Sequence, residues 1–350
     1  MNKGGVESIV LNYSKALKND VEPTFVCFDD SKEIPIEEIN SIGGHYFIVP
    51  HVKHLGKFKK AFKKILTENH FDIIHSHINT LSVFPLKVAK QAKYPIRIAH
   101  SHSQSSKNEF LRNMVKNFLR KFSKKYATYY IACGEIAGRY QFGNKAYDNG
   151  EVHIVKNAID IAKFAYSEVD RLAVRKELNI PENTPVVGNI GRLCQTKNQT
   201  YVLSIAKKMP ETHFVIVGGG PLQEDLEKAI KENNLHNVHL AGTTENTARY
   251  YSAFDTFILP SLYEGVPVTG IEAQANGVYV IFSNNVPKES MVSTFGEFLP
   301  IGDENIDKWV ESLSNVRQNE DHTQEVINSG FSINEASNNL LQIYKSLLSK

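Results

Sequence analysis

The sequence predicts an α/β protein built from two doubly wound domains. Short apolar runs of strand length alternate with amphipathic runs of helix length, which is typical of parallel sheets covered by helices. The chain has 350 residues, enough for two domains with separate cores. Its charge divides as well: residues 1–156 hold 24 Lys and Arg against 14 Asp and Glu, whereas the remainder holds 16 against 24. We therefore expect domains over 1–160 and 161–330, and a C-terminal helix over 331–350 that packs back on the first domain.

The first half alternates apolar strand candidates with amphipathic stretches. Helical spacing of apolar residues appears over Phe58–Glu68 and Phe110–Lys125. The expected strands are Thr24–Phe28, His45–Val49, Asp72–His75, Ile96–His100, Tyr129–Ala132 and Val152–Val155.

The second half has more continuous apolar runs, as strands buried on both faces require. The expected strands are Val186–Ile190, His213–Val217, Val238–Ala241, Thr256–Leu259 and Tyr279–Phe282. The expected helices are Asn198–Lys208, Gln223–Asn233, Thr247–Ala253, Gly270–Asn276 and the amphipathic C-terminal stretch Ile333–Leu348. In sheets of this kind ligands bind at the carboxyl ends of the strands, so we look for chemistry in the strand-to-helix loops.

Composition restricts the class of protein. Hydrophobic residues make up 41% of the chain and charged residues 22%, which is ordinary for a soluble globular protein. No stretch has the ~18 apolar residues of a membrane span, and the first residues lack the apolar run of a signal peptide. The three cysteines are scattered and odd in number, which favours a reducing cytoplasm. No nucleic-acid-binding motif is present, so we expect no nucleic-acid partner.

The most informative segment follows the expected strand Thr256–Leu259. It turns through Gly265 and Pro267 and enters a helix that contains Glu272. The unpaired N–H groups of a helix N-terminus suit a diphosphate, and the segment that offers them here is Val266, Pro267, Val268 and Thr269. Glu264 lies in the loop, and we expect both glutamates to face one crevice. One carboxylate would accept hydrogen bonds from ribose hydroxyls, and the other would lie beside a transferred sugar.

Glu264 and Glu272, with seven residues between them, resemble the E-x7-E motif of family 4 glycosyltransferases. The resemblance extends over nearly the whole chain and is greatest to bacterial capsular and exopolysaccharide transferases. It implies a GT-B fold, in which two Rossmann-like domains face a cleft. It also implies that Glu264 contacts the donor sugar and that Glu272 binds the ribose of the nucleotide.

A second loop carries two cations. Gly191, Arg192 and Lys197 follow the expected strand Val186–Ile190 and precede a helix. Cations at such a turn can neutralise the charge that develops on a departing diphosphate. Taken alone, the two side chains could equally be surface cations. In the family that the chain resembles, the matching Arg and Lys bind the donor phosphates.

A glycine-rich turn follows the next strand. Gly218, Gly219 and Gly220 permit a close approach of the backbone, although the segment is not a complete G-x-G-x-x-G fingerprint. The resemblance implies that this turn lies beside the nucleotide, with Gly219 at the donor. It also implies that the loop containing Thr243 takes part in recognition of the base.

Two His-x-His pairs end neighbouring strands of the first half. They are His75 with His77 and His100 with His102. Three interpretations remain open: packing, a contact to donor or acceptor, and a metal site, since imidazole is a common zinc ligand. No carboxylate or cysteine completes a coordination set in either pair, and the chain has no Asp-x-Asp, so we expect no metal and no other cofactor. The resemblance implies one active-site histidine, for which we choose His102, with His100 as the alternative.

Near the N-terminus, Gly4 and Gly5 precede an amphipathic run. In related transferases a Gly-Gly turn before the first helix approaches donor and acceptor, and it follows an apolar first strand. This sequence has no such strand ahead of the glycines. We therefore expect the sheet of the first domain to lack a central strand, at a cost in stability.

The segment 107–125 combines an apolar stripe with basic residues. Leu111, Met114, Val115, Phe118, Leu119 and Phe122 have helical spacing among lysines and arginines. A second basic cluster lies in 53–64. The stripe either faces the core, with solvated lysines around it, or docks on an anionic membrane, and the two can coexist.

These features predict a retaining, metal-independent transfer of a sugar from a nucleotide diphosphate, most commonly a UDP-sugar, to a growing lipid-linked surface glycan. The retention, the UDP donor and the absence of a metal are implied by the resemblance. The expected location is the cytoplasm, on the inner face of the membrane. Three alternatives stay open: a nucleotide-sugar epimerase of the same fold, a zinc hydrolase built on the histidines, and a non-catalytic sugar-nucleotide-binding protein.

Overall fold

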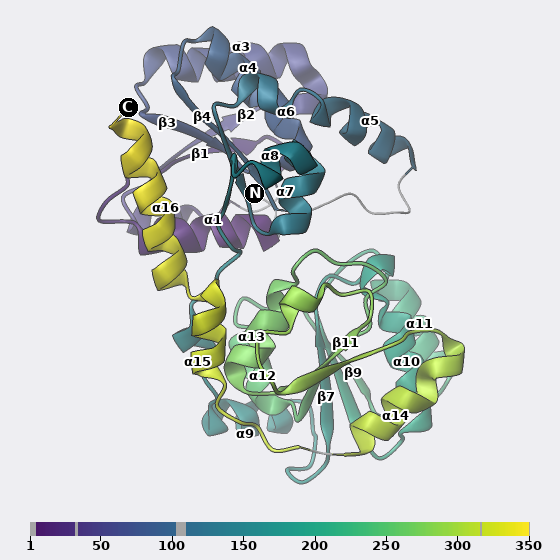
Figure 1. Ribbon diagram of the computed structural model, residues 1–350. Coiled ribbons are helices and arrows are strands. Elements are labelled where there is room, and N and C mark those ends of the chain that lie inside the picture. The colour runs from purple at the N-terminus through teal and green to yellow at the C-terminus, as the bar shows by residue number, and fades with distance from the viewer. Residues whose placement is uncertain (1–4, 32–33, 103–109, 316, 350) are drawn as a thin grey trace. The chain divides into compact units, whose positions relative to one another are not determined.

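The computed structural model describes residues 5–31, 34–102, 110–315 and 317–349 (Figure 1). The chain forms two compact units. Unit 1 consists of 1–158 together with 333–350, and unit 2 consists of 159–332. The C-terminal helix α16 (Ile333–Leu348) belongs to unit 1, where it packs against α1 (Gly5–Ala16).

Unit 2 is a six-stranded parallel sheet with helices on both faces. The strand order is β12-β11-β10-β7-β8-β9. All five expected strands are present, and a sixth, β12, was not predicted because Gly296 and Glu297 interrupt its apolar pattern. The strand bounds are β7 Val186–Ile190, β8 His213–Val217, β9 Val238–Gly242, β10 Thr256–Leu259, β11 Tyr279–Ser283 and β12 Gly296–Leu299.

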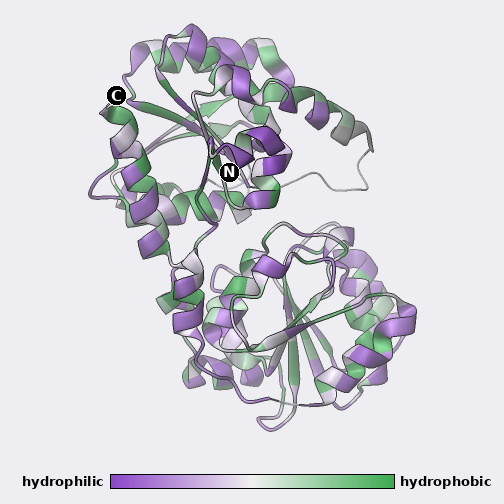
Figure 2. Ribbon diagram, viewed as in Figure 1, coloured by the Kyte–Doolittle hydropathy of each residue, from purple (hydrophilic) through white to green (hydrophobic). Residues whose placement is uncertain are grey.

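The two faces of this sheet build two cores, because successive strand residues point to opposite sides. Phe257 and Leu259 pack in one core, while Ile258, the residue between them, packs in the other beside Trp309. Figure 2 shows the hydrophobic strands enclosed by helices with mixed colouring. The helices are α9 Glu168–Glu177, α10 Gln199–Lys208, α11 Gln223–Glu232, α12 Ala248–Ala253, α13 Val268–Asn276, α14 Ile306–Ser314 and α15 Thr323–Val326.

The strand order of unit 2 reverses between β7 and β10. From β7 the chain proceeds outward through β8 and β9, and then returns to pair β10 on the other side of β7. Ligands of doubly wound sheets bind at this switch point, beyond the carboxyl ends of the two central strands. The loop that follows β7 contains the cationic pair, and the loop that follows β10 contains Glu264 and leads into α13, which contains Glu272.

Unit 1 also has six described parallel strands, but its sheet is divided. One part has the order β1-β2 and the other β3-β4-β5-β6, and within the described residues no strand joins β1 to β3. The helices α3 and α4 nevertheless cover both parts, with Phe47 of β2 and Ile74 of β3 in one cluster. The strands are β1 Thr24–Phe28, β2 His45–Val49, β3 Ile73–Ser76, β4 Ile96–Ser101, β5 Tyr129–Ala132 and β6 Val152–Ile154.

The other helices of unit 1 complete its two outer layers. The helix expected over Phe110–Lys125 is wrong in one respect, because the structure divides it into α5 and α6. At the junction the amides of Lys121 and Phe122 bond to carbonyls three residues back, which tightens the last turn of α5 and ends it. The bounds are α2 Ile36–Ser41, α3 Leu55–Glu68, α4 Val83–Gln91, α5 Phe110–Arg120, α6 Ser123–Tyr126, α7 Glu135–Phe142 and α8 Asn144–Asp148.

A buried ion-pair network surrounds Asp255 at the amino end of β7. Asp255 accepts from Arg171 at 2.7 Å, from Arg175 at 2.8 Å and from the amide of Val186 at 2.7 Å. Arg175 is 1% exposed, and four backbone carbonyls take its remaining hydrogen bonds. Its charge therefore depends on Asp255 for compensation.

We expect Asp255→Ala to lower the free energy of unfolding by about 3–5 kcal/mol, because it leaves the Arg175 guanidinium buried without its partner. Urea unfolding followed by the fluorescence of Trp309, the single and fully buried tryptophan, measures the change. Asp307, paired with Lys208 in solvent, supplies the control Asp307→Ala, which should change little. Equal effects of the two substitutions would contradict this account of the network.

Candidate active site

Glu264 lies in the loop that follows β10, and an ion pair holds it there. Its Oε1 accepts from Lys197 Nζ at 2.6 Å and from the Ser261 hydroxyl at 2.7 Å. Both charged side chains are mostly buried, with 18% of the lysine and 12% of the glutamate exposed. Lys197 belongs to the loop after β7, so the pair joins the two loops at the switch point. Both residues were predicted from the sequence to belong to the site, whereas their direct ion pair is seen only in the structure.

The loop after β7 is fixed by backbone contacts. Asn198 adopts a left-handed conformation (φ +58°), and its side-chain amide donates to the carbonyl of Pro260 at 3.0 Å. The amide of Leu262 donates to the carbonyl of Thr196 at 2.9 Å. Arg192 is exposed, and within the described part of the chain no ion pair holds its guanidinium. A cation in this state can bind an anionic ligand without first losing a partner.

The helix α13 begins directly beyond this loop. Pro267 is its N-cap residue, and Val268 and Thr269 form its first turn. Proline fits this position although it has no backbone N–H group, because the N–H groups at a helix start have no intrahelical partner. The Thr269 hydroxyl is buried and finds no hydrogen-bond partner among the described residues. Gly265 and Val266 lead into this turn and are partly buried. The start of α13 thus offers backbone N–H groups and one hydroxyl that can donate hydrogen bonds to a bound ligand.

Glu272 lies one turn into α13, partly buried, beside the hydroxyl of Tyr251. The hydroxyl is 2.7 Å from Glu272 Oε2 and 3.0 Å from the carbonyl of Thr269. Burial raises the pKa of the Glu272 carboxyl, while the bond from Tyr251 and the charges of Lys163 and Lys197 lower it. Lys197 therefore acts on both glutamates, by contact on Glu264 and through space on Glu272.

The glycine turn after β8 packs directly on the loop after β7. A Cβ on Gly218 would lie 2.0 Å from the Gly191 carbonyl oxygen, and one on Gly220 would lie 2.2 Å from that of Leu193. Gly218 also has a φ of +139°, which side chains rarely adopt. These glycines therefore allow two loops of the site to touch. Gly219 lies beside Thr243, whose methyl group would be 2.7 Å from a Cβ at that position.

Three functional candidates lie elsewhere. Gly4 is outside the described residues, and Gly5 is the first residue of α1, with no heavy atom of its surroundings within 4 Å of the place where a Cβ would stand. His102 belongs to unit 1. The structure thus gathers the unit 2 candidates at the carboxyl edge of one sheet and leaves these three residues to the other unit.

The four histidines of unit 1 come together, as their positions at strand ends predicted. The rings of His75 and His77 stack with centroids 4.0 Å apart, and those of His100 and His102 do the same. Across the strands, His75 Nε2 is 3.2 Å from His100 Nδ1, and His77 Nδ1 is 3.0 Å from His102 Nε2. The cluster lies at the carboxyl ends of β3 and β4.

His102 has polar contacts through both its ring and its backbone amide. Its ring Nδ1 is 2.9 Å from Asn157 Oδ1, and its backbone amide donates to Asn79 at 2.7 Å. His100, the alternative, has a buried Nε2 without a partner in the described chain. Burial lowers the pKa of His102 to about 4, partly offset by Asn157. Burial and then the charge of His102 lower the pKa of His75 to about 3, so the rings stay neutral at physiological pH.

This neutrality predicts a loss of stability in acid. The pKa of His102 in the folded chain lies below its ordinary value of 6.5, so the unfolded chain binds the proton first as the pH falls. Between pH 7.5 and pH 5 we expect this residue alone to cost about 2 kcal/mol of unfolding free energy. Urea unfolding of unit 1, followed by circular dichroism at both pH values, measures the loss. The loss should be smaller in His102→Gln, and an unchanged loss would contradict the assignment.

Three of these histidines could also approach a metal ion. The ring nitrogens of His75, His77 and His100 lie within 4.8 Å of one another. They form the one such group of three His, Cys, Asp or Glu among the residues the structure describes. The absence of a metal stays a prediction, tested below with a chelator.

Several residues of these sites were missed by sequence reasoning. Tyr251 lies on α12, and only tertiary packing brings its hydroxyl to Glu272. Asn157 follows β6, while its partner follows β4. Ser261 alone carried a usable signal, a small polar residue directly beyond a buried strand.

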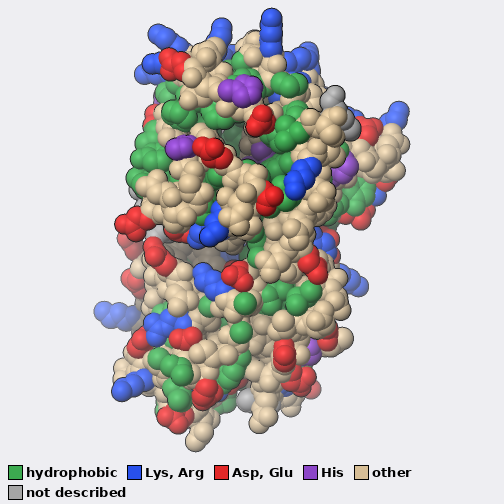
Figure 3. Space-filling view, turned by 90° about the vertical axis from the view of Figure 1, so that its left-hand side faces the viewer, with side chains coloured by type: hydrophobic (Ala, Val, Ile, Leu, Met, Phe, Trp, Pro, Cys, Tyr) green, Lys and Arg blue, Asp and Glu red, His purple; other side chains and the backbone are tan. Residues whose placement is uncertain are grey.

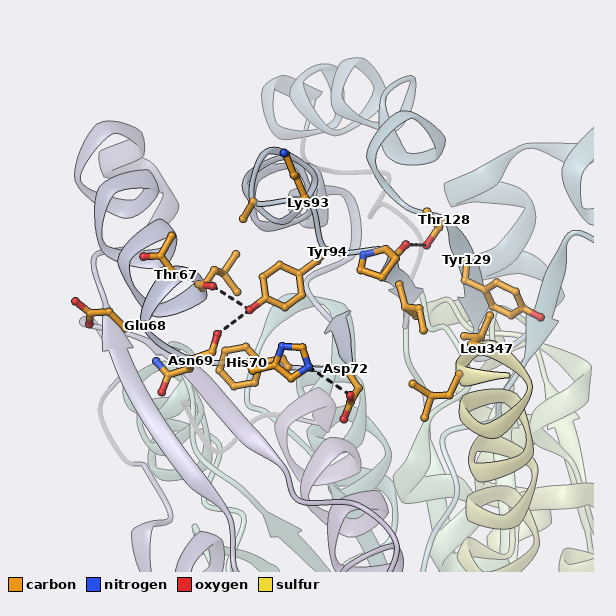
Figure 4. Close-up of a pocket in the computed structure, with 16 residues that line it drawn as sticks. Thr67, Glu68, Asn69, His70, Asp72, Lys93, Tyr94, Thr128, Tyr129 and Leu347 are labelled. Atoms are coloured by element: carbon orange, nitrogen blue, oxygen red, sulfur yellow. Dashed lines mark hydrogen bonds and ion pairs between the residues drawn. The ribbon is translucent and has the colours of Figure 1, made fainter. Parts of the chain in front are cut away.

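A large pocket of about 1060 Å³ lies in unit 1, away from the cluster of His75, His77, His100 and His102 (Figure 4). It is lined at the amino ends of the strands by residues such as Asp72, Tyr94 and Thr128, together with Leu347 of α16. The Tyr94 hydroxyl lies within hydrogen-bonding distance of one backbone carbonyl in α3 and of the carbonyl of the residue that directly follows α3. Ligands of doubly wound sheets bind at the opposite, carboxyl edge, so we place no substrate in this pocket.

The fold is the GT-B fold of solved glycosyltransferase structures. The structure is similar to that of Anabaena Alr3699/HepE in complex with UDP-glucose, with a TM-score of 0.76, 15% identity and coverage of 99% of this chain and 95% of that one. The profile "Glycosyl transferases group 1" matches residues 170–332, and "Glycosyltransferase Family 4" matches residues 3–163.

Curated relatives agree with both profiles. The putative glycosyltransferase EpsF of Bacillus subtilis is 32% identical over 303 residues, which cover 83% of this chain and 78% of that protein. The capsular polysaccharide biosynthesis glycosyltransferase CapH of Staphylococcus aureus is 27% identical over 99% of this chain and 96% of its own. An Escherichia coli UDP-Gal:alpha-D-GlcNAc-diphosphoundecaprenol alpha-1,3-galactosyltransferase is 27% identical over 72% and 68%.

The chain belongs to the family 4 glycosyltransferases, and its residues 170–332 form a domain of the group 1 glycosyl transferases. It is a transferase of class EC 2.4, as its resemblance to this family predicted.

Proposed function

We propose that the protein transfers a sugar from a UDP-sugar to a lipid-linked acceptor during synthesis of a surface polysaccharide, with retention at the anomeric carbon and without a metal. The observation that carries this proposal is the arrangement at the switch point of unit 2. There a Lys197–Glu264 pair lies around two adjoining loops together with Arg192, which has no ion pair, and the Thr269 hydroxyl at a helix start, which has no hydrogen-bond partner, within the residues that the structure describes.

The charges of this arrangement suit a diphosphate leaving group. The bond between the anomeric carbon and the diphosphate oxygen breaks, and that oxygen keeps the electron pair. Arg192, Lys197 and the first amides of α13 would stabilise the negative charge, which is the part a metal ion plays in other transferases. The acceptor hydroxyl forms the new bond to the anomeric carbon and passes its proton to the departing diphosphate.

The carboxylates have separate tasks in this proposal. Glu272, held beside the Tyr251 hydroxyl, binds the ribose hydroxyls of the nucleotide. Glu264 accepts hydrogen bonds from hydroxyls of the donor sugar. Its ion pair with Lys197 holds the carboxylate in position before the donor binds. His102 of unit 1, neutral and oriented by Asn157, contacts the sugar as a donor or acceptor of a hydrogen bond.

The choice of donor and acceptor is supported by relatives. HepE was solved with UDP-glucose, and the Escherichia coli relative is named for UDP-Gal and a diphosphoundecaprenol acceptor. CapH is named for capsular polysaccharide biosynthesis. Within the described residues no helix combines the length and the apolar content that crossing a membrane requires. We place the reaction in the cytoplasm, at the inner face of the membrane where a lipid-linked acceptor is presented.

The proposal is tested by incubating the protein with a panel of nucleotide sugars and lipid-linked acceptors while released nucleotide is measured. We expect UDP release that requires acceptor and is unchanged by EDTA. Loss of turnover with EDTA, restored by zinc, would contradict metal independence and assign a role to the histidine group. A donor sugar altered without any acceptor would instead show an epimerase, and donor binding without release would show a non-catalytic protein.

A further inference from the structure

The helix α5 presents an apolar face to solvent. Met114, Val115 and Phe118 are 54%, 58% and 60% exposed, and their spacing puts them on one side of the helix. Leu119, one turn beyond Val115 at the border of this face, is buried and anchors the helix to unit 1. The stripe therefore faces the core only in part. Figure 1 shows α5 extending from the edge of unit 1.

Cations border this face on α5 and α6. Lys121, Lys124 and Lys125 are exposed, and Arg120 lies over the ring of Tyr140 with 4.9 Å between guanidinium and centroid. Lys124 pairs with Glu151 at 2.8 Å. The apolar side chains thus lie within one turn of a positively charged border. We call Met114, Val115, Phe118, Lys121 and Lys125 the α5 surface.

The second basic helix of unit 1 has no comparable face. On α3 the apolar residues Phe58, Phe62 and Ile65 are buried in the core, while Lys60 and Lys63 point to solvent. Figure 3 shows Lys and Arg side chains projecting at the top of unit 1, where Figure 1 places α3. Both helices therefore carry basic residues, and α5 differs from α3 in the exposed apolar residues that lie between them.

We propose that the α5 surface docks unit 1 on an anionic lipid bilayer. Apolar side chains on one face of a helix with lysines beside them are the features by which helices lie in a membrane interface. The lysines meet acidic headgroups, and the aromatic and aliphatic side chains enter the region below them. Charge complementarity thus favours an anionic bilayer over a second copy of this chain, whose α5 would carry the same positive charge. This docking stands on unit 1 alone and does not require the proposed transfer reaction.

Flotation of the full-length protein with phosphatidylglycerol or phosphatidylcholine vesicles tests the proposal, with no donor or acceptor present. We expect binding to phosphatidylglycerol vesicles that high salt weakens, and little binding to phosphatidylcholine. The double variant Met114→Ser, Phe118→Ser should bind the anionic vesicles at least ~10-fold more weakly. Circular dichroism and thermal unfolding verify that this variant folds.

The α3 helix supplies the matched control. Lys121→Glu with Lys125→Glu should abolish flotation, whereas Lys60→Glu with Lys63→Glu changes the net charge equally and should leave most of it. Equal losses from the two pairs would overturn the proposal in favour of attraction by overall charge. Absence of wild-type binding, or a concentration-dependent dimer that the Met114, Phe118 variant abolishes, would overturn it as well.

Discussion

Arg192→Ala and Glu272→Ala are each expected to lower kcat/KM for sugar transfer by about 100-fold or more. Arg192 would no longer stabilise the leaving diphosphate, an electrostatic contribution of the size measured for single donors in other active sites. Glu272 would no longer hold the ribose, and the Tyr251 hydroxyl would lose one of its two neighbours. Steady-state kinetics with a UDP-sugar and acceptor measure both effects.

The two variants should differ in which parameter changes. Glu272→Ala removes a contact made to bound donor and should mainly raise KM, whereas Arg192→Ala should mainly lower kcat. Lys228→Ala and Glu232→Ala, which break an exposed pair on α11, are the matched controls. Turnover unchanged in Arg192→Ala and Glu272→Ala, or lowered equally in all four variants, would contradict the site.

A strand added to unit 1 is expected to raise its stability markedly. β1 and β3 each pair on one side among the described residues, although α3 and α4 cover both parts of the sheet. α1 begins at Gly5 and packs on β1, with Leu11 against Phe25. A strand leading into α1 and placed beside β1 would follow the right-handed crossover rule and give both edges a partner.

The test joins five strand-forming apolar residues to Met1. We expect the melting temperature of this chain to rise by ~5 °C or more. The amides of β1 and β3 should also exchange more slowly, and Val26, now 39% exposed, should become covered. A Gly-Ser extension of the same length is the control. If both extensions act alike, the two parts of the sheet offer no place for a further strand.

The alternation of apolar strands and amphipathic helices was enough to predict the strands of unit 2 except β12. Strands buried on both faces are recognisable as continuous apolar runs, whereas β12 lies at the sheet edge, half-buried and containing Gly296. The switch point could be reached in the same way, since its loops carry motif residues directly beyond predicted strands.

Contacts between distant segments could not be predicted from the sequence. The distance from Lys197 to Glu264 depends on how the loops after β7 and β10 pack, through contacts such as the one from the Asn198 side chain to the Pro260 carbonyl. Tyr251 is one of 15 tyrosines, and nothing local distinguishes it from the others. Sequence patterns predict which edge of a sheet carries a residue, but not its partner across that edge.

Hydrogen exchange of the wild-type protein with and without UDP tests the central claim most directly, because it locates the nucleotide without requiring the acceptor. The account predicts slower exchange in unit 2 over 191–198, 218–220 and 263–272, and little change in that protection when EDTA is present. Unchanged exchange in all three segments, or protection confined to residues 66–72 and 92–96 around the unit 1 pocket, would contradict a donor site at the switch point.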